Sequence, residues 1–170
     1  MLDLNELCGM RGKNAVITGA ASGLGAGIAR FFAGAGVKVM LLDINEKGGE
    51  EGAAEIRGSG GDAVFMRCDV TSQADCAAAA EAAFRRWGGI DCLVNCAGAT
   101  RRRTVEDLEE KDWDLVLNVT LKSVYLMCHN VVPYMKEQGH GKIVNIGSGW
   151  ALKGGDRAVA YCASKGGVWN

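Results

Sequence analysis

The sequence predicts an α/β fold in which helices cover both faces of a parallel sheet. Short apolar runs alternate along the chain with longer amphipathic or alanine-rich runs. The short runs are continuously apolar, as in strands buried on both faces, and their alternation with helical runs is typical of a parallel sheet. A glycine-rich turn joins the first apolar run to the first helical run. Because no linker, repeat or low-complexity segment interrupts this pattern, we expect residues 1–170 to form a single domain.

The elements are expected in the order of these runs. The apolar runs predict strands at 15–18, 37–42, 63–68, 92–95 and 142–146. Apolar residues at helical spacing predict a helix at 23–35, and a polar run closed by a glycine turn at 58–61 predicts a helix at 46–57. An alanine-rich run predicts a helix at 72–87, capped by Thr71 or Ser72. A helical region at 105–136, as one helix or two, has Pro133 near its end, and a further helix begins at Val159. The crossovers between parallel strands should be right-handed.

Composition narrows the class of protein. A formal net charge of -1 predicts neither a nucleic-acid-binding surface nor a strongly acidic partner. The N-terminus has early acids and no apolar run of signal length, and no stretch approaches the roughly 20 apolar residues of a membrane span. The seven scattered cysteines, Cys8 among them, include no CxxC pair. They predict reduced thiols in a cytoplasmic protein, with no metal, since Cys92 and Cys96 lack a second ligand pair.

The glycine-rich turn predicts a site for a dinucleotide. TGAASGLG follows the first strand and opens the first helix, with spacing GxxxGxG rather than the commoner GxGxxG. Glycine lets the backbone approach a pyrophosphate, and the helix N-terminus offers N–H groups to it. The alternative is a tight turn without a ligand. The candidate residues are Gly19, Ser22, Gly23, Leu24 and Gly25.

Polar residues at other strand ends extend this site. Asp43 ends the second strand, where an acid can bind both hydroxyls of the adenine ribose and would repel a 2′-phosphate. Since Ser22 also places no basic side chain in the turn, NAD is favoured over NADP. The alternative for Asp43 is a strand-end or capping acid. Two further strand ends, which ordinary turn chemistry would also explain, add Asp69, Val70, Asn95, Ala97 and Gly98.

A second group of residues predicts acid/base chemistry. Tyr161 and Lys165 are four apart and share one helix face, so the ammonium favours the phenolate form and makes Tyr161 a workable acid/base. Ser148 follows the fifth strand, where its hydroxyl could hold the same substrate oxygen. Asn118 is a polar residue in an apolar helical setting, where a buried amide needs a partner. Each of these features alone has a structural alternative. Tyr161 and Lys165 could be a pair on a helix surface, and Ser148 could be a helix cap. Asn118 could donate a hydrogen bond to a helix carbonyl.

Taken together, TGAASGLG, Asp43, Asp69-Val70, NCAG, Asn118, Ser148 and YCASK resemble the short-chain dehydrogenase/reductase family from about Arg11 to Val168. The resemblance implies a Rossmann-type, doubly wound NAD(P)-binding domain with strand order 3-2-1-4-5. It implies an NAD-dependent oxidoreductase that interconverts a secondary alcohol and a ketone. Tyr161 would be the general acid/base, Lys165 would assist it and both would bind the nicotinamide ribose. Ser148 would stabilise the substrate oxygen, and Asn118 would hold a relay water.

The sequence departs from the family in two places. Cys96 stands where an asparagine is common, which is tolerable if the side chain packs inward. The chain ends five residues after Lys165, so the family's last strands would be missing and the fifth strand would be an uncovered edge. The family's usual homo-oligomer is therefore doubtful for this chain. Two functions compete: a working oxidoreductase, or a truncated, catalytically inactive product that is a nucleotide-binding fragment or a partner of a longer homologue.

The substrate is expected to be a small-molecule alcohol or ketone, with sugars, polyols, steroids and 3-hydroxyacyl compounds all open. Arg101, Arg102 and Arg103 follow the NCAG turn and could attract an anionic substrate. The favoured alternative is a solvated loop, or ion pairs with Glu106 and Asp107. The residues after Ser148 that could line the site are Trp150, Leu152 and Lys153.

Overall fold

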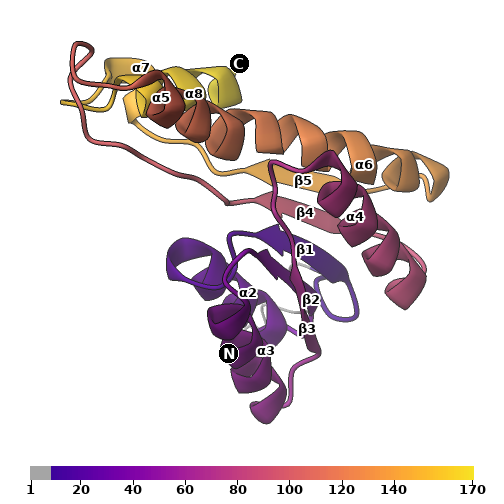
Figure 1. Cartoon of the computed structure of the whole chain (residues 1–170). Helices are drawn as coiled ribbons and strands as arrows, with labels where there is room; N and C mark the ends of the chain where they lie inside the picture. The colour runs from indigo at the N-terminus through magenta and orange to yellow at the C-terminus, as the bar shows by residue number, and fades with distance from the viewer. Residues whose placement is uncertain (1–8) are drawn as a thin grey trace.

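The computed structural model describes residues 9–170, which form a five-stranded parallel sheet (Figure 1). Its order, β3-β2-β1-β4-β5, confirms the predicted order and the Rossmann-type fold. The strands are β1 Asn14–Thr18, β2 Lys38–Asp43, β3 Ala63–Arg67, β4 Cys92–Asn95 and β5 Lys142–Asn145. Each lies within one residue of its predicted bounds, because a continuous apolar run between turns leaves little choice of register.

Two pairs of helices cover the two faces of the sheet (Figure 1). The helices α2 Gly23–Gly34 and α3 Glu46–Gly58 lie on one face, and α4 Gln73–Trp87 and α6 Ser123–Glu137 lie on the other. Strand residues alternate between the two cores. Val16 and Leu93 pack with α4 and α6, while Ile17, Leu41 and Val94 pack with α2 and α3. Because both faces are covered, the three central strands are almost entirely buried.

Helix ends follow ordinary capping chemistry. The Asn45 side chain accepts a hydrogen bond from Gly48 N at the start of α3. Ser72, rather than Thr71, caps α4 and accepts from Asp75 N, and Gly88 ends α4 in the left-handed region. Ser22 begins α2 without a side-chain hydrogen bond to its first turn. That first turn therefore keeps N–H groups available to a ligand.

The long helical region differs from its prediction. Residues 105–109 form turns and a short extended stretch, and helix begins only at α5 Glu110–Leu117. One π-helical segment, η1 Asn118–Lys122, joins α5 to α6, and Pro133 lies inside α6. The run Glu110–Glu137 contains an 18-residue window of mean hydropathy 1.3, so by length and composition alone it could cross a membrane. Part of that apolarity is explained by the α6 side chains in the sheet core.

Two further helices lie beyond β5. The sequence did not predict α7 Trp150–Lys153, whereas α8 Val159–Trp169 begins where expected and packs against α5, η1 and α7. As expected, β5 is an edge strand, and its Ile143 and Val144 are 38% and 45% exposed. None of the six cysteines within residues 9–170 is in a disulfide, while Cys8 and the first N-terminal residues lie outside the described part.

Candidate active site

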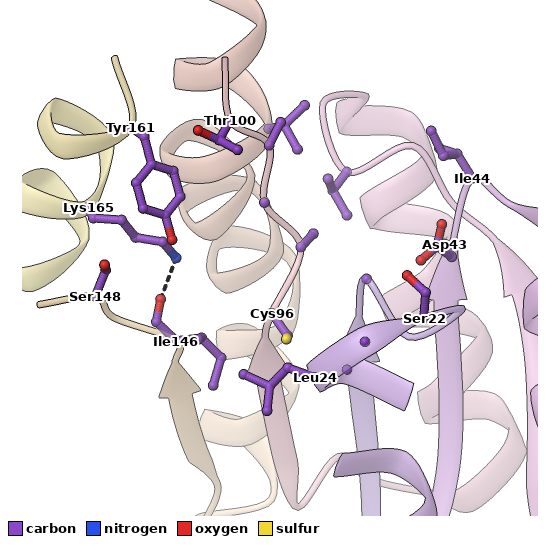
Figure 2. A pocket seen from close by; sticks show the side chains of 18 of the residues that line it. Ser22, Leu24, Asp43, Ile44, Cys96, Thr100, Ile146, Ser148, Tyr161 and Lys165 are labelled. Atoms are coloured by element: carbon purple, nitrogen blue, oxygen red, sulfur yellow. Dashed lines mark hydrogen bonds between the residues drawn. The ribbon is translucent and has the colours of Figure 1, made fainter. Parts of the chain in front are cut away.

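A cleft of about 890 Å³ opens at the carboxyl ends of the strands (Figure 2). Ser22, Asp43 and Ile44 lie at one end, and Tyr161, Lys165 and Ser148 lie at the other, with Leu24 and Cys96 between them. The sequence motifs that were separate along the chain therefore meet in one place. The predicted residues that line the cleft are Gly19, Ser22, Gly23, Leu24, Gly25, Asp43, Asp69, Val70, Ala97, Gly98, Ser148, Tyr161 and Lys165.

Two predicted residues, Asn95 and Asn118, do not line the cleft. Asn95 is buried at the end of β4, where its Nδ2 donates to Asn145 Oδ1 over 2.8 Å and joins β4 to β5. Asn118 is half-buried at the first position of the π-helical segment η1. Such segments are frequent at functional sites because they alter the course of a helix locally.

Glycine is required at two positions of the turn. Gly19 has φ +66°, and a Cβ there would lie 2.8 Å from Ala97 Cα. A Cβ on Gly25 would overlap the Gly19 carbonyl oxygen. The turn therefore packs backbone against backbone, and a ligand at this place would meet main-chain atoms. The first turn of α2, uncapped by Ser22, faces the same end of the cleft.

The Asp43 carboxylate lines the cleft and also holds two backbone segments together. Its Oδ2 accepts from Ala21 N and its Oδ1 accepts from Asn45 N, both at 3.0 Å. The carboxylate thus joins the glycine-rich turn to the loop that starts α3. A carboxylate has about four lone-pair sites, so two backbone donors leave capacity for ligand hydroxyls.

The loop after β3 is tied to α4. Asp75 Oδ2 accepts from Asp69 N at 2.9 Å, and Ser72 Oγ donates to Asp75 Oδ1 at 2.9 Å. These two hydrogen bonds hold the pKa of Asp75 below its ordinary value, the backbone donor having the larger effect. Asp69 in turn accepts from both the N–H and the hydroxyl of Thr71. The backbone at Asp69 and Val70 is therefore held in place against the cleft.

Two buried threonine hydroxyls organise the loop after β4, and the sequence did not single them out. Thr18 Oγ1 accepts from Cys96 N at 3.0 Å and from Ala97 N at 3.1 Å. Thr120 Oγ1 accepts from Ala99 N at 3.0 Å, and its hydroxyl donates to Ala99 O at 3.1 Å. Thr18 is 2% exposed and Thr120 is fully buried. The available sequence signals were a threonine that ends an apolar run before the glycine-rich turn, for Thr18, and a threonine within an apolar helical run, for Thr120.

The other end of the cleft brings the acid/base candidates together. Lys165 is buried, and its Nζ donates to Ile146 O and lies 5.8 Å from the Tyr161 ring centroid (Figure 2). Burial lowers the pKa of Lys165, and the nearby Cys96 thiol opposes that change to a smaller extent. Ser148 Oγ accepts from Trp150 N at 3.2 Å, so the serine proton is available to a ligand oxygen.

Several lining residues were not predicted, and they adjoin motif residues or follow strand ends. They are Ile44, Cys68, Ala99, Thr100, Val119 and Ile146. Cys96 is half-buried: it packs against the α2–α3 core and also lines the cleft. Burial raises the pKa of its thiol, and the Lys165 charge lowers it by less. Within residues 9–170 there is no cluster of three His, Cys, Asp or Glu side chains that could hold a metal ion.

As the favoured alternative expects, the arginine loop is solvated, with Arg101, Arg102 and Arg103 all exposed, but within the described residues it makes no ion pair with Glu106 or Asp107. Arg101 Nε instead donates to Asp112 Oδ1 at 3.2 Å. Asp107 Oδ2 accepts a hydrogen bond from the Thr104 hydroxyl at 2.8 Å. Arg102 lines the cleft, with its guanidinium carbon 4.7 Å from the Trp150 ring centroid. Of the three residues proposed after Ser148, Trp150 lines the cleft, whereas Leu152 and Lys153 do not.

The family model described as short chain dehydrogenase matches residues 13–170. The chain is 45% identical to a D-threitol dehydrogenase of Mycolicibacterium smegmatis, over 92% of this chain and 60% of that protein. It is 38% identical to a 2,5-dichloro-2,5-cyclohexadiene-1,4-diol dehydrogenase of Sphingobium indicum, over 94% of this chain and 64% of that protein. It thus spans less than two thirds of the length of these curated relatives.

The fold of this chain is also similar to that of a solved short chain dehydrogenase. A crystal structure of a short chain dehydrogenase from Mycobacterium smegmatis matches with a TM-score of 0.90 and 33% identity. That match covers 94% of this chain and 68% of the other. Since the family model spans nearly all of the described residues, the chain belongs to the short chain dehydrogenase family.

Proposed function

We propose that this chain binds NAD and supplies the acid/base residues of an oxidoreductase that interconverts a secondary alcohol and a ketone. The observation that carries the proposal is a single cleft with a glycine-rich turn and Asp43 at one end and Tyr161, Lys165 and Ser148 at the other (Figure 2). The names of both relatives describe dehydrogenases of alcohols, threitol and a cyclohexadiene diol, which supports this substrate class.

The residues present fit a nicotinamide dinucleotide. The cleft volume of about 890 Å³ is in the range of cofactor sites. Gly19 and Gly25 leave no room for a side chain, and the uncapped start of α2 suits a pyrophosphate. Asp43 would accept the adenine ribose hydroxyls and repel a 2′-phosphate, so the proposal is NAD rather than NADP.

A bound nicotinamide would supply the hydride acceptor or donor of the reaction, and the side chains would transfer the proton. Tyr161 as phenolate takes the alcohol proton, or as phenol gives it to the ketone oxygen. The buried ammonium of Lys165 stabilises the phenolate. Ser148, whose oxygen is already engaged by Trp150 N, donates its proton to the same substrate oxygen. Asn118 does not line the cleft, and its proposed role, to hold a water of the proton relay, rests on the resemblance to the family.

The test measures NADH binding by fluorescence and NAD reduction with a panel of secondary alcohols. Tyr161→Phe should lower turnover by about 10²–10⁴-fold, the usual contribution of a general acid/base, with little change in NADH affinity. Tyr125→Phe is the matched control, since Tyr125 is 62% exposed on α6 and outside the cleft. If the wild-type chain neither binds NADH nor oxidises any alcohol, the proposal is wrong.

A second candidate function is nucleotide binding without turnover, in partnership with a longer homologue. The place of β5 at the edge of the sheet formed by the described residues, with Ile143 and Val144 exposed, favours it. NADH binding with no oxidation of any alcohol in the panel would support this candidate.

We also propose a cytoplasmic location, because the six cysteines within residues 9–170 are free thiols. Neither a nucleic acid nor a membrane is proposed as a partner.

A further inference from the structure

Arg102 occupies a defined place at the acid/base end of the cleft. Its guanidinium carbon lies 4.7 Å from the centroid of the Trp150 ring. Trp150 in turn meets Tyr161 edge to face, with ring centroids 5.9 Å apart and an interplanar angle of 87°. All three side chains line the cleft. One indole ring therefore contacts both the Arg102 guanidinium and the Tyr161 ring.

Arg102 has no carboxylate neighbour in the part of the chain that the structure describes. No Asp or Glu oxygen in residues 9–170 lies within 4.0 Å of its guanidinium nitrogens. The preceding residue, Arg101, pairs with Asp112 instead and does not line the cleft. The two adjacent arginines thus carry the same charge, but only Arg101 is in an ion pair and only Arg102 lines the cleft. Arg102 keeps its five N–H donors for another acceptor.

The surroundings hold this stack in place. Arg103 N donates to Arg157 O at 2.8 Å, and Arg103 forms an isolated parallel bridge with Ala158. Arg157 has φ +51°, an unfavourable conformation for a non-glycine residue that this tie helps to maintain. The Trp150 ring is packed so closely that a Cβ on Gly155 would lie 2.5 Å from it. A planar guanidinium on a fixed ring loses less freedom when it binds a ligand.

The two ends of the cleft differ in charge. Of the carboxylates that line it, Asp43 ends β2 and Asp69 follows β3, on the far side of the sheet from β5. At the Tyr161 end the charged lining groups are Arg102 and Lys165, both cations. Lys165 is buried and bonded to Ile146 O, whereas Arg102 is exposed. A substrate at this end meets a positive field and one accessible guanidinium.

We propose that Arg102 selects substrates that carry an anionic group (a carboxylate, sulfonate or phosphate) a few bonds away from the carbinol or carbonyl carbon. The anion accepts hydrogen bonds from the guanidinium while the reacting oxygen lies at Tyr161 and Ser148. The indole ring that contacts both side chains sets the spacing between the two ends of such a substrate. This inference rests on the proposed function, since it describes the substrate of the same site.

The experiment compares matched substrates with and without charge. The probes are 3-hydroxybutanoate, 4-hydroxypentanoate and 5-hydroxyhexanoate, each beside its amide, with NAD as acceptor. The wild-type chain should favour one of the acids over its amide by about tenfold or more in kcat/KM. Arg102→Met should lower kcat/KM for that acid by about 10- to 100-fold, the range for a lost hydrogen bond to a charged group, and change the amide less than threefold. Added salt should weaken only the reaction of the acid.

Arg101→Met is the control, because it removes the same charge one residue away. It should leave the acid-to-amide ratio within threefold of the wild type. Equal use of acids and amides by the wild type, or an equal loss of both in Arg102→Met, would overturn the inference and leave the proposed function intact. If no alcohol is oxidised at all, calorimetric titration of 4-oxopentanoate and its amide into the protein with NADH decides the inference alone. Equal affinity for the two ketones would then overturn it.

Discussion

The Thr120 hydroxyl is bonded to both backbone groups of one residue, Ala99. Ala99 N donates to Thr120 Oγ1 at 3.0 Å, and the hydroxyl donates to Ala99 O at 3.1 Å. Thr120 is fully buried in the π-helical segment η1, while Ala99 and the next residue, Thr100, line the cleft. Figure 2 shows Thr100 at the end of the cleft that holds Tyr161. The Thr120 side chain on η1 therefore fixes the backbone conformation of a residue at the acid/base end of the cleft.

Removing this hydroxyl should weaken binding of the nicotinamide half of the cofactor. Thr120→Val keeps the shape but leaves Ala99 N without its partner, which costs about 1–3 kcal/mol for a buried donor. We expect NADH affinity, measured by fluorescence titration, to fall about tenfold while AMP affinity stays within twofold. Thr120→Ser keeps the hydroxyl and should retain NADH binding. Unchanged NADH affinity in Thr120→Val, or an equal loss in Thr120→Ser, would contradict a specific role of the hydroxyl.

The close backbone packing in the glycine-rich turn gives a second prediction. Gly25→Ala would force a Cβ onto the Gly19 carbonyl oxygen, so the turn must open and both stability and NADH binding should fall. Gly27→Ala is the matched control on the same helix, because a Cβ at Gly27 would meet no atom within 4 Å. That change should stabilise the protein by up to about 1 kcal/mol through helix propensity. Urea unfolding and NADH titration measure both effects. An unaltered Gly25→Ala protein would contradict the packing argument.

The strand-end acid should determine the choice between NAD and NADP. Asp43→Ser removes the charge that repels a 2′-phosphate but keeps a short hydrogen-bonding side chain. NADPH affinity should rise relative to NADH affinity by about tenfold or more, in line with removal of a close like charge. Some stability should be lost as well, since Ala21 N and Asn45 N lose a shared acceptor. Fluorescence titration with both nucleotides checks the ratio, which an ordinary strand-end acid would leave unchanged.

How much the sequence could predict depends on how local each feature is. The strands were found because a buried parallel strand is a continuous apolar run, and the motifs were expected to meet because strand ends share one edge of the sheet. The π-helical segment η1 was not found, since the helical pattern of the sequence continues through it, and its contact of Thr120 with Ala99 joins residues 21 apart. The four-residue helix α7 is too short to show any periodicity.

The arginine loop shows the same limit. Arg101, Arg102 and Arg103 are identical in type and consecutive, so nothing in the sequence separates them. The structure separates them by partner: Asp112 for Arg101, and the Trp150 ring for Arg102. Those partners lie 11 and 48 residues further along the chain, and the fold alone brings them together.

Acid should destabilise the fold through Asp75. Its folded-state pKa is lowered because it accepts from Asp69 N and from the Ser72 hydroxyl. A lowered pKa means that its stabilisation is present above the ordinary value of 3.8 and is lost as pH falls through the folded-state value. Asp75→Asn should cost about 1 kcal/mol of unfolding free energy at neutral pH, from weakened hydrogen bonds to a charged acceptor.

The difference between wild type and Asp75→Asn should therefore shrink in acid, because protonation removes from the wild type what the variant already lacks. Urea unfolding at a series of pH values measures it. Asp114→Asn, which replaces an exposed carboxylate on α5, is the control and should stay within about 0.5 kcal/mol of the wild type. A gap between wild type and Asp75→Asn that stays constant from neutral pH into acid would show that the charge of Asp75 does not stabilise the loop at Asp69.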